Sequence, residues 1–193
     1  MAGSIAGAIL APIGAAMGAV IVEAIRRSRS PRLRHTGFLG VGGGYGGLWG
    51  APGTLLRKDT GLFRFQAGYR TRPLGAGEGV ALEAAFGVLL RARSTGPEPE
   101  QQMTLTTVGG ELRFYGRARS AAQPYLQAGG ARYGLDAEST LAGAGLQLGG
   151  GFLLWPLHHL ALDLNLLYDA AFLAGAEHAV HGLNASLGVR FYF

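Results

Sequence analysis

The chain ends in "HGLNASLGVRFYF" (residues 181–193), where apolar and polar side chains alternate up to the last residue. Successive side chains of an extended strand point to opposite faces, so this alternation predicts a β-strand and not a helix. A C-terminus is usually frayed unless the fold holds it, so an apolar face that reaches the end predicts a strand fixed in a sheet. That face consists of Leu183, Ala185, Leu187, Val189, Phe191 and Phe193.

The composition leaves too few charged residues to cover a soluble surface. Of 193 residues, 48% are hydrophobic and 15% are charged, against about 25% charged in ordinary soluble domains. The 34 glycines exceed the usual share of about 7%. Lys58 is the only lysine, whereas soluble barrels normally carry lysines on their outer faces and edges. The length suits one domain with a short appendage.

The net charge of +5 arises near the N-terminus. Five arginines lie in "IRRSRSPRLRHTG" (residues 25–37), and the chain from residue 37 onward holds 12 basic and 11 acidic residues. Because no basic face interleaved with stacking aromatics is present, we expect no nucleic-acid partner. The absence of cysteine excludes disulfides and thiolate metal sites.

Residues 1–24 are apolar, rich in small side chains and uncharged before Glu23. One interpretation is a signal peptide, since Val22 and Ala24 suit the small-residue positions before a cleavage site. The other is a retained helix with closely packing glycines, although Pro12 would kink it. We therefore expect a signal-like segment or apolar helix at 1–24, an Arg-rich linker at 25–36 and the main domain at 37–193.

The main domain consists of alternating segments separated by Gly, Pro, Ser and charged clusters, which is typical of β-strands and turns. In "LFRFQAGYR" (62–70) and "LALDLNLLY" (160–168), for example, every second side chain is apolar. Strands of this length can cross a bilayer at a tilt, which takes about 9–11 residues. The register of the fifth and sixth segments is ambiguous. The expected strands are 38–50, 61–72, 79–92, 103–117, 123–134, 141–155, 159–169 and 181–193.

The polar face of these segments is too sparse for a soluble exterior and suits a narrow lumen, because the interior of an eight-stranded barrel is just filled by side chains. We expect its ions to fill and specify the interior rather than to transport or catalyse. Aromatic residues near segment ends are typical of interfacial girdles. The lumen candidates are Arg64, Arg70, Glu83, Arg91, Glu111, Arg113, Asp163 and Arg190. The girdle candidates are Trp49, Tyr69, Trp155, Tyr168, Phe191 and Phe193.

With its eight alternating segments and the closing "LGVRFYF" (187–193), the chain resembles the small outer-membrane β-barrels of Gram-negative bacteria, the OmpA/OmpX-type class. The resemblance implies an all-β, eight-stranded, antiparallel, up-and-down transmembrane barrel in contact with outer-membrane lipid. It also implies that the barrel assembly machinery reads the last strand as a signal. That role falls on Phe193, with Phe191, Val189 and Leu187 on the same face.

A structural, interaction or surface role with a non-conducting lumen is the main functional hypothesis, and a lipid-modifying enzyme is its alternative. Nucleophilic hydrolysis needs a hydroxyl near a histidine that an acid orients. The pair His158 and His159 has no serine or threonine nearby in sequence, whereas "DAAFLAGAEHAVH" (169–181) combines two acids with His178 and His181. Such a loop could hold a metal, but we expect it to be solvated. We therefore expect no cofactor, no metal and no catalytic residue.

An even number of strands places the start of the first strand and the end of the last strand on the same side of the membrane. We therefore expect "PLGAGEG" (73–79), "RSAAQP" (119–124) and "PLHH" (156–159) to form the periplasmic turns. The longer connections near 51–60, 93–102 and 170–180 are then outer loops, as in membrane barrels generally.

Overall fold

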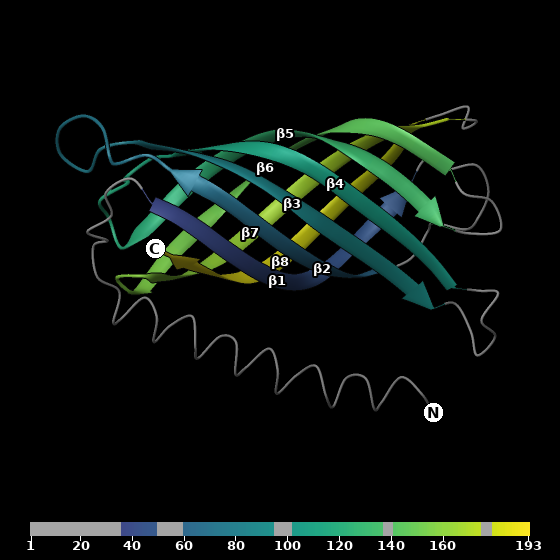
Figure 1. The fold of residues 1–193 in the computed structure, drawn as a ribbon, viewed down its shortest axis with the longest axis horizontal. Coiled ribbons are helices and arrows are strands. Elements are labelled where there is room, and N and C mark those ends of the chain that lie inside the picture. The colour runs from purple at the N-terminus through teal and green to yellow at the C-terminus, as the bar shows by residue number, and fades with distance from the viewer. Residues whose placement is uncertain (1–35, 50–59, 95–101, 137–140, 175–178) are drawn as a thin grey trace, which may run out of the picture.

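The computed structural model describes residues 36–49, 60–94, 102–136, 141–174 and 179–193. These residues form one closed barrel of eight strands (Figure 1), which confirms the expected strand number. The N-terminal segment expected at 1–24 lies outside the described residues, and of the linker expected at 25–36 only Thr36 is described, where it is the first residue of β1 and not part of a linker. The strands are β1 (Thr36–Trp49), β2 (Thr60–Arg70), β3 (Ala81–Ser94), β4 (Gln102–Tyr115), β5 (Ala122–Asp136), β6 (Leu141–Leu157), β7 (Leu160–Leu173) and β8 (Val180–Tyr192).

Each strand pairs antiparallel with its neighbours in sequence, and β1 also pairs with β8, which closes the sheet. The strands are tilted (Figure 1), and closing a tilted sheet requires a stagger between its first and last pairings. A walk across directly paired residues starts in β1 at residue 39 and returns to β1 at residue 49, a stagger of ten residues. The walk passes through Leu39, Ala67, Phe86, Gly110, Gly130, Leu146, Ala170, His181 and Trp49.

Side chains alternate between the inside and the outside of the barrel, and most of the large apolar ones face outward. Leu112 of β4 and Leu126 of β5 are 66% and 70% exposed. The inward positions of the same strands carry buried polar groups such as Arg113 and Gln127. This arrangement is the reverse of a soluble domain and is that of a barrel surrounded by lipid. Within the described ranges, no helix is long and apolar enough to cross a membrane.

At one end of the barrel β1 begins and β8 ends, and residues 71–80, 116–121 and 158–159 join the other strands there; this end is called here the turn end (Figure 1). Three glycines of the β2–β3 turn adopt left-handed φ angles, for example +82° at Gly75 and +62° at Gly77. Glycine tolerates these angles without steric cost, because it has no Cβ. The guanidinium of Arg119, in the next turn, donates to the carbonyls of Gly75 (3.0 Å) and Gly77 (2.8 Å). The opposite end, at Trp49 and Leu173, is the loop end.

The structure defines the registers that were ambiguous. In β6, Gln147, Leu153 and Trp155 are buried on the inward face, whereas Leu148 is exposed. The expectation that Trp155 belongs to an outward girdle is therefore wrong: its ring lies 4.7 Å from that of Tyr192 inside the barrel. Leucines occupy both faces of this strand, so alternation alone could not reveal its register. β7 also continues to residue 173, beyond the predicted end at 169.

Candidate functional site

The barrel interior is the candidate functional site, because it gathers the buried charges of the chain. All eight charged residues assigned to the lumen point inward, and seven of them are buried. The eighth, Arg64, exposes 11% of its side chain. A buried charge is stable only when opposite charges and hydrogen bonds compensate it, so the partners of each ion define the site.

Arg113 lies at the centre of an ion-pair network that spans several strands. Its Nε lies 2.8 Å from Oε1 of Glu111, and its Nη1 lies 2.9 Å from Oδ2 of Asp163. Arg64 of β2 pairs with the second oxygen of Glu111. The network therefore ties β2 and β4 to β7 across the interior.

Arg190 of β8 extends the network to β3. Its Nε donates to Oδ2 of Asp163 at 2.9 Å, and its Nη1 pairs with Glu83. The carboxylate of Glu83 also accepts hydrogen bonds from the hydroxyls of Tyr115 (3.1 Å) and Tyr192 (3.0 Å). Both oxygens of this buried carboxylate therefore have donors.

Asp169 anchors a second cluster nearer the loop end. It pairs with Arg91 and accepts hydrogen bonds from Asn184 (2.6 Å), Tyr133 (3.0 Å) and Gln147 (2.8 Å). The sequence placed Asp169 in a candidate metal loop. Asp169 is also the last residue of the strand expected at 159–169, and the structure places it in β7, buried and with both carboxylate oxygens accepting hydrogen bonds, so it does not belong to a loop.

Arg70 points inward and is the direct partner of Glu83 in the pairing of β2 with β3, but within the described residues it forms no ion pair. Its Nη2 donates to Oε1 of Gln123 at 2.5 Å. Its guanidinium carbon lies 4.1 Å from the ring centre of Tyr115 and 5.7 Å from that of Trp155. Aromatic faces attract cations when both are shielded from water, so these rings stabilise the buried charge of Arg70.

Aromatic side chains fill the interior at the turn end. The ring centres of Phe38 and Tyr192 lie 5.3 Å apart, and those of Tyr115 and Tyr125 lie 5.2 Å apart. These residues and Trp155 belong to one buried apolar cluster. The interior is thus packed with rings at this end and with ions at mid-height.

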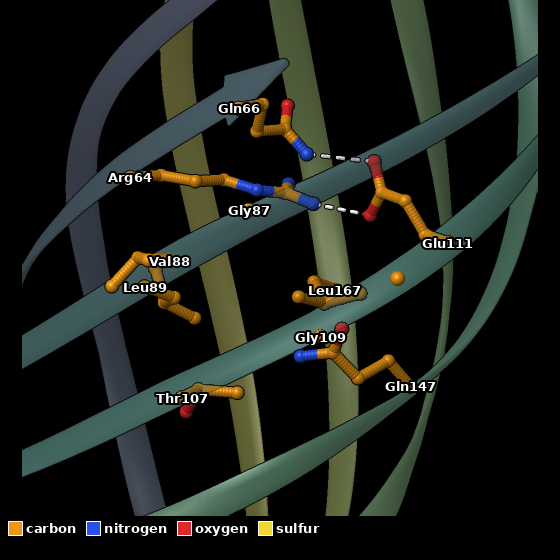
Figure 2. A pocket seen from close by; sticks show the side chains of 11 residues that line it. Arg64, Gln66, Gly87, Val88, Leu89, Thr107, Gly109, Glu111, Gln147 and Leu167 are labelled. Atoms are coloured by element: carbon orange, nitrogen blue, oxygen red, sulfur yellow. Dashed lines mark hydrogen bonds and ion pairs between the residues drawn. The ribbon is translucent and has the colours of Figure 1, made fainter. Parts of the chain in front are cut away.

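Two small cavities remain beside Arg64. Figure 2 shows the larger one, with Arg64 and Gln66 both reaching toward Glu111. Its volume is about 20 Å³, and that of the second cavity, which Arg64 and Gln66 also line, is about 10 Å³. A water molecule needs at least about 10–15 Å³, so these cavities have room for single waters and not for a solute.

Several residues of the interior were not among the predicted site residues. Gln66 links the two halves of the network, because its Nε2 donates to Glu111 (2.7 Å) and its Oε1 accepts from Arg190 (2.7 Å). Tyr125 donates to Asp163 at 2.6 Å and accepts from Asn165 at 2.8 Å. The alternation of β2 and β7 placed Gln66 and Asn165 on the polar face, whereas the ambiguous register of β5 concealed Tyr125.

The candidate loop histidines do not form an active site among the described residues. His178 lies outside the described residues. His181 faces outward, where its Nδ1 lies 2.7 Å from the hydroxyl of Tyr168 and its ring stacks with that of Trp49. Nor do three or more His, Cys, Asp or Glu side chains gather as a metal site in the described part of the chain.

The four residues of the predicted assembly signal lie on the outward face of β8 and its end. Val189, Phe191 and Phe193 are exposed, and the rings of the two phenylalanines stack 6.5 Å apart. The backbone N–H of Phe193 donates to the carbonyl of Gly37 at 3.0 Å. The terminal residue is therefore held against β1, and its side chain faces the surroundings. Leu187, the fourth residue of the predicted signal, is partly buried on the same face.

Comparison with known proteins supports the fold assignment. No family model matches the chain, and no curated protein matches it. Among solved structures, neisserial surface protein A is 20% identical with a TM-score of 0.65, and the match covers 81% of this chain and 97% of that one.

Two further structures share the architecture. Ail of Yersinia pestis, the attachment invasion locus protein, is 14% identical with a TM-score of 0.53, over 83% of this chain and all of that one. The N-terminal β-barrel domain of Pseudomonas aeruginosa OprF is 16% identical with a TM-score of 0.52, over 83% and 98% of the two chains. The chain thus has the fold of the small eight-stranded outer-membrane β-barrels.

Proposed function

We propose that this chain is a small protein of the bacterial outer membrane with a non-conducting barrel and a structural, interaction or surface role. The outward face supports the membrane location, because exposed leucines and phenylalanines cover the strands and lipid is the solvent that favours such a surface. The outer membrane is proposed because the fold is that of outer-membrane barrels.

The filled interior is the observation that supports a non-conducting barrel. Ion pairs occupy the middle of the lumen and aromatic rings occupy its turn end. Opening a path for ions would separate Arg113 and Arg190 from their carboxylates, and breaking buried ion pairs is costly. We propose no catalytic role for the described residues.

Two experiments test this proposal. Fractionation of intact cells that make the full chain, followed by electrophoresis with and without boiling, should find a heat-modifiable barrel in the outer membrane. The purified barrel in a planar lipid bilayer should then give no discrete current steps, with a general porin as the positive control. Recovery from another compartment would refute the location, and reproducible current steps would refute the closed lumen.

A matched pair of variants connects the closed state to the interior. The variant R64A/Q66A removes the two side chains that line both cavities and should raise ion leak through the barrel. The variant L126A shortens an outward side chain of β5 and leaves the interior filled, so its leak should equal that of the wild type. Equal leak in both variants would contradict the role assigned to the interior.

A further inference from the structure

Arg132 of β5 interrupts the apolar outward face. Its direct partners across the sheet are Val108 of β4 and Ala144 of β6, and it is exposed on the same face as Leu126. Among the outward-facing strand side chains that the structure describes, Arg132 is the single charged one. An ionisable residue on a membrane-spanning surface is costly unless it has a partner or serves a function.

The stagger of the barrel gives the height of Arg132 in the membrane. Halfway round the barrel the stagger amounts to about five residues, so Gly130 lies level with Gly44 of β1. Arg132 is two residues nearer the loop end, so it lies level with Gly46 and close to the height of Tyr45. Tyr45 is an exposed outward ring, and such rings mark the membrane–water interface of barrels. Arg132 therefore reaches the headgroup region on the loop side.

Apart from Val108 and Thr106 on β4 and Leu146 on β6, the outward residues nearest Arg132 have small side chains. Gly130 and Gly134 flank it on β5, and Gly110, Ala142 and Ala144 lie on the neighbouring strands. A Cβ added at Gly134 would meet no atom within 4 Å, and one at Gly130 would meet its nearest atom at 3.8 Å. A long guanidinium side chain on such a surface is accessible to a molecule that approaches from the lipid.

We propose that Arg132 and this small-residue surface, formed by β4, β5 and β6, bind the phosphate of a phosphorylated glycolipid of the lipid A type in the outer leaflet. The inference rests on the proposed outer-membrane location. Arg pairs with phosphate through two parallel charge-assisted hydrogen bonds. No described ion pair or hydrogen bond engages the Arg132 side chain, and no described outward side chain on the strands is acidic.

Charge complementarity also favours lipid over a second copy of the chain. A two-fold dimer through this face would bring two Arg132 side chains toward each other, and the described outward side chains offer no carboxylate to separate them. A phosphate at the depth of Arg132 supplies the missing negative charge. Acyl chains can lie against Gly130 and Ala144, which carry no bulky side chain themselves and lie beside the exposed side chain of Leu146.

Native mass spectrometry of the full chain in phosphatidylcholine nanodiscs tests the inference. The nanodiscs contain a small fraction of lipid A or of the same lipid without its phosphates, and bound lipids are counted after release. Wild type should retain the phosphorylated form about tenfold better than R132A, since the loss of one charge-assisted pair corresponds to roughly that factor. R132K should show an intermediate preference, because lysine contacts phosphate as a point charge.

A relocated arginine is the matched control. Gly61 of β2 is exposed and pairs with Tyr45, and a Cβ added there would meet no atom within 4 Å. The variant R132A/G61R therefore keeps an arginine at nearly the same height, among other neighbours, and should not recover the preference. Full recovery would overturn the assignment to the β4–β6 surface.

The remaining outcomes are decisive as well. Equal retention of both lipid forms by wild type and R132A would overturn the inference while leaving the outer-membrane proposal intact. A dimer that R132A dissolves, without any lipid preference, would assign the face to a second copy and overturn it too. A chain that does not enter nanodiscs at all would overturn the proposed function together with this inference.

Discussion

Arg190 and Glu83 lie 107 residues apart in sequence and form a buried ion pair inside the barrel. The pair connects β8 directly to β3 across the barrel interior, although these two strands are not neighbours in the sheet. Backbone hydrogen bonds connect each strand only to its neighbours, whereas this contact depends on the complete barrel. The ion pair therefore reports whether the barrel has closed with the correct register.

Replacing Arg190 by leucine should lower the free energy of unfolding by about 3–5 kcal/mol, because Glu83 loses the cation that compensates its buried charge. Urea titration of the barrel in lipid vesicles, followed by tryptophan fluorescence, measures this change. Trp155 is a suitable reporter, because its ring packs against that of Tyr192 inside the barrel. The variant E83L/R190L should recover part of the loss, since it removes both charges.

The exposed pair between Arg117 and Glu78 is the control for this prediction. Its side chains are 65% and 58% exposed, and exposed pairs contribute only about 0–1 kcal/mol. R117L should therefore change the urea midpoint little. Equal losses in R190L and R117L would mean that the interior pair does not stabilise the barrel.

Asn165→Ala should lower the free energy of unfolding by about 1–3 kcal/mol, because it leaves buried partners without hydrogen bonds. The side-chain amide of Asn165 donates to Tyr125 (2.8 Å) and Gln127 (3.0 Å) and accepts from Arg64 (3.3 Å). The same urea titration applies. Ser186, the direct neighbour of Asn165 on β8, offers a control, and a loss in Ser186→Ala as large as that in Asn165→Ala would contradict the role of these bonds.

Gly151→Ala should reduce the yield of folded barrel, because a Cβ at this inward position would lie 1.9 Å from the carbonyl oxygen of Leu164. The neighbouring backbone would have to move, and such overpacking costs about 1–3 kcal/mol. Gly61→Ala is the matched control, since its Cβ would have open space, and it should be neutral. The fraction of heat-modifiable protein after refolding measures both. Equal yields would show that the sheet adapts to a methyl group at residue 151.

Much of the fold was predictable because outward and inward side chains differ in kind. In β2 and β7, large apolar residues alternate with Arg64, Gln66, Asp163 and Asn165, so strand, face and lumen could be read directly. Strand number and closure follow from eight such segments, because a membrane barrel has no free edges.

The partners inside the barrel were less predictable, because they depend on register and stagger. Tyr133 and Trp155 lie on strands rich in glycine and leucine, where both faces carry similar residues. Alternation placed Arg91 on the inward face, but its partner Asp169 lies at the predicted end of β7, and this strand extends further than its pattern suggested. Which arginine meets which carboxylate is a property of the closed barrel and not of any segment.

Phe193→Asp should reduce insertion into the outer membrane far more than it reduces the stability of the folded barrel. The side chain of Phe193 is 67% exposed, and its backbone bond to Gly37 does not depend on the ring. Acidic side chains near a membrane interface cost less than the roughly 0–1 kcal/mol of Arg or Lys there, so a large defect would be one of recognition by the assembly machinery. Quantitative blotting of outer-membrane fractions measures insertion, and urea titration of refolded protein measures stability.

Phe172→Asp is the control at the opposite end of the barrel. Phe172 of β7 is an outward aromatic with similar exposure, 63%, but it lies near the loop end. If the signal resides in the last residues of the chain, Phe172→Asp should insert nearly as well as the wild type while Phe193→Asp accumulates outside the outer membrane. Equal insertion of Phe193→Asp and wild type would refute the signal role of Phe193. Equal defects in both variants would mean that the membrane rejects the charge at either rim, independently of any recognition.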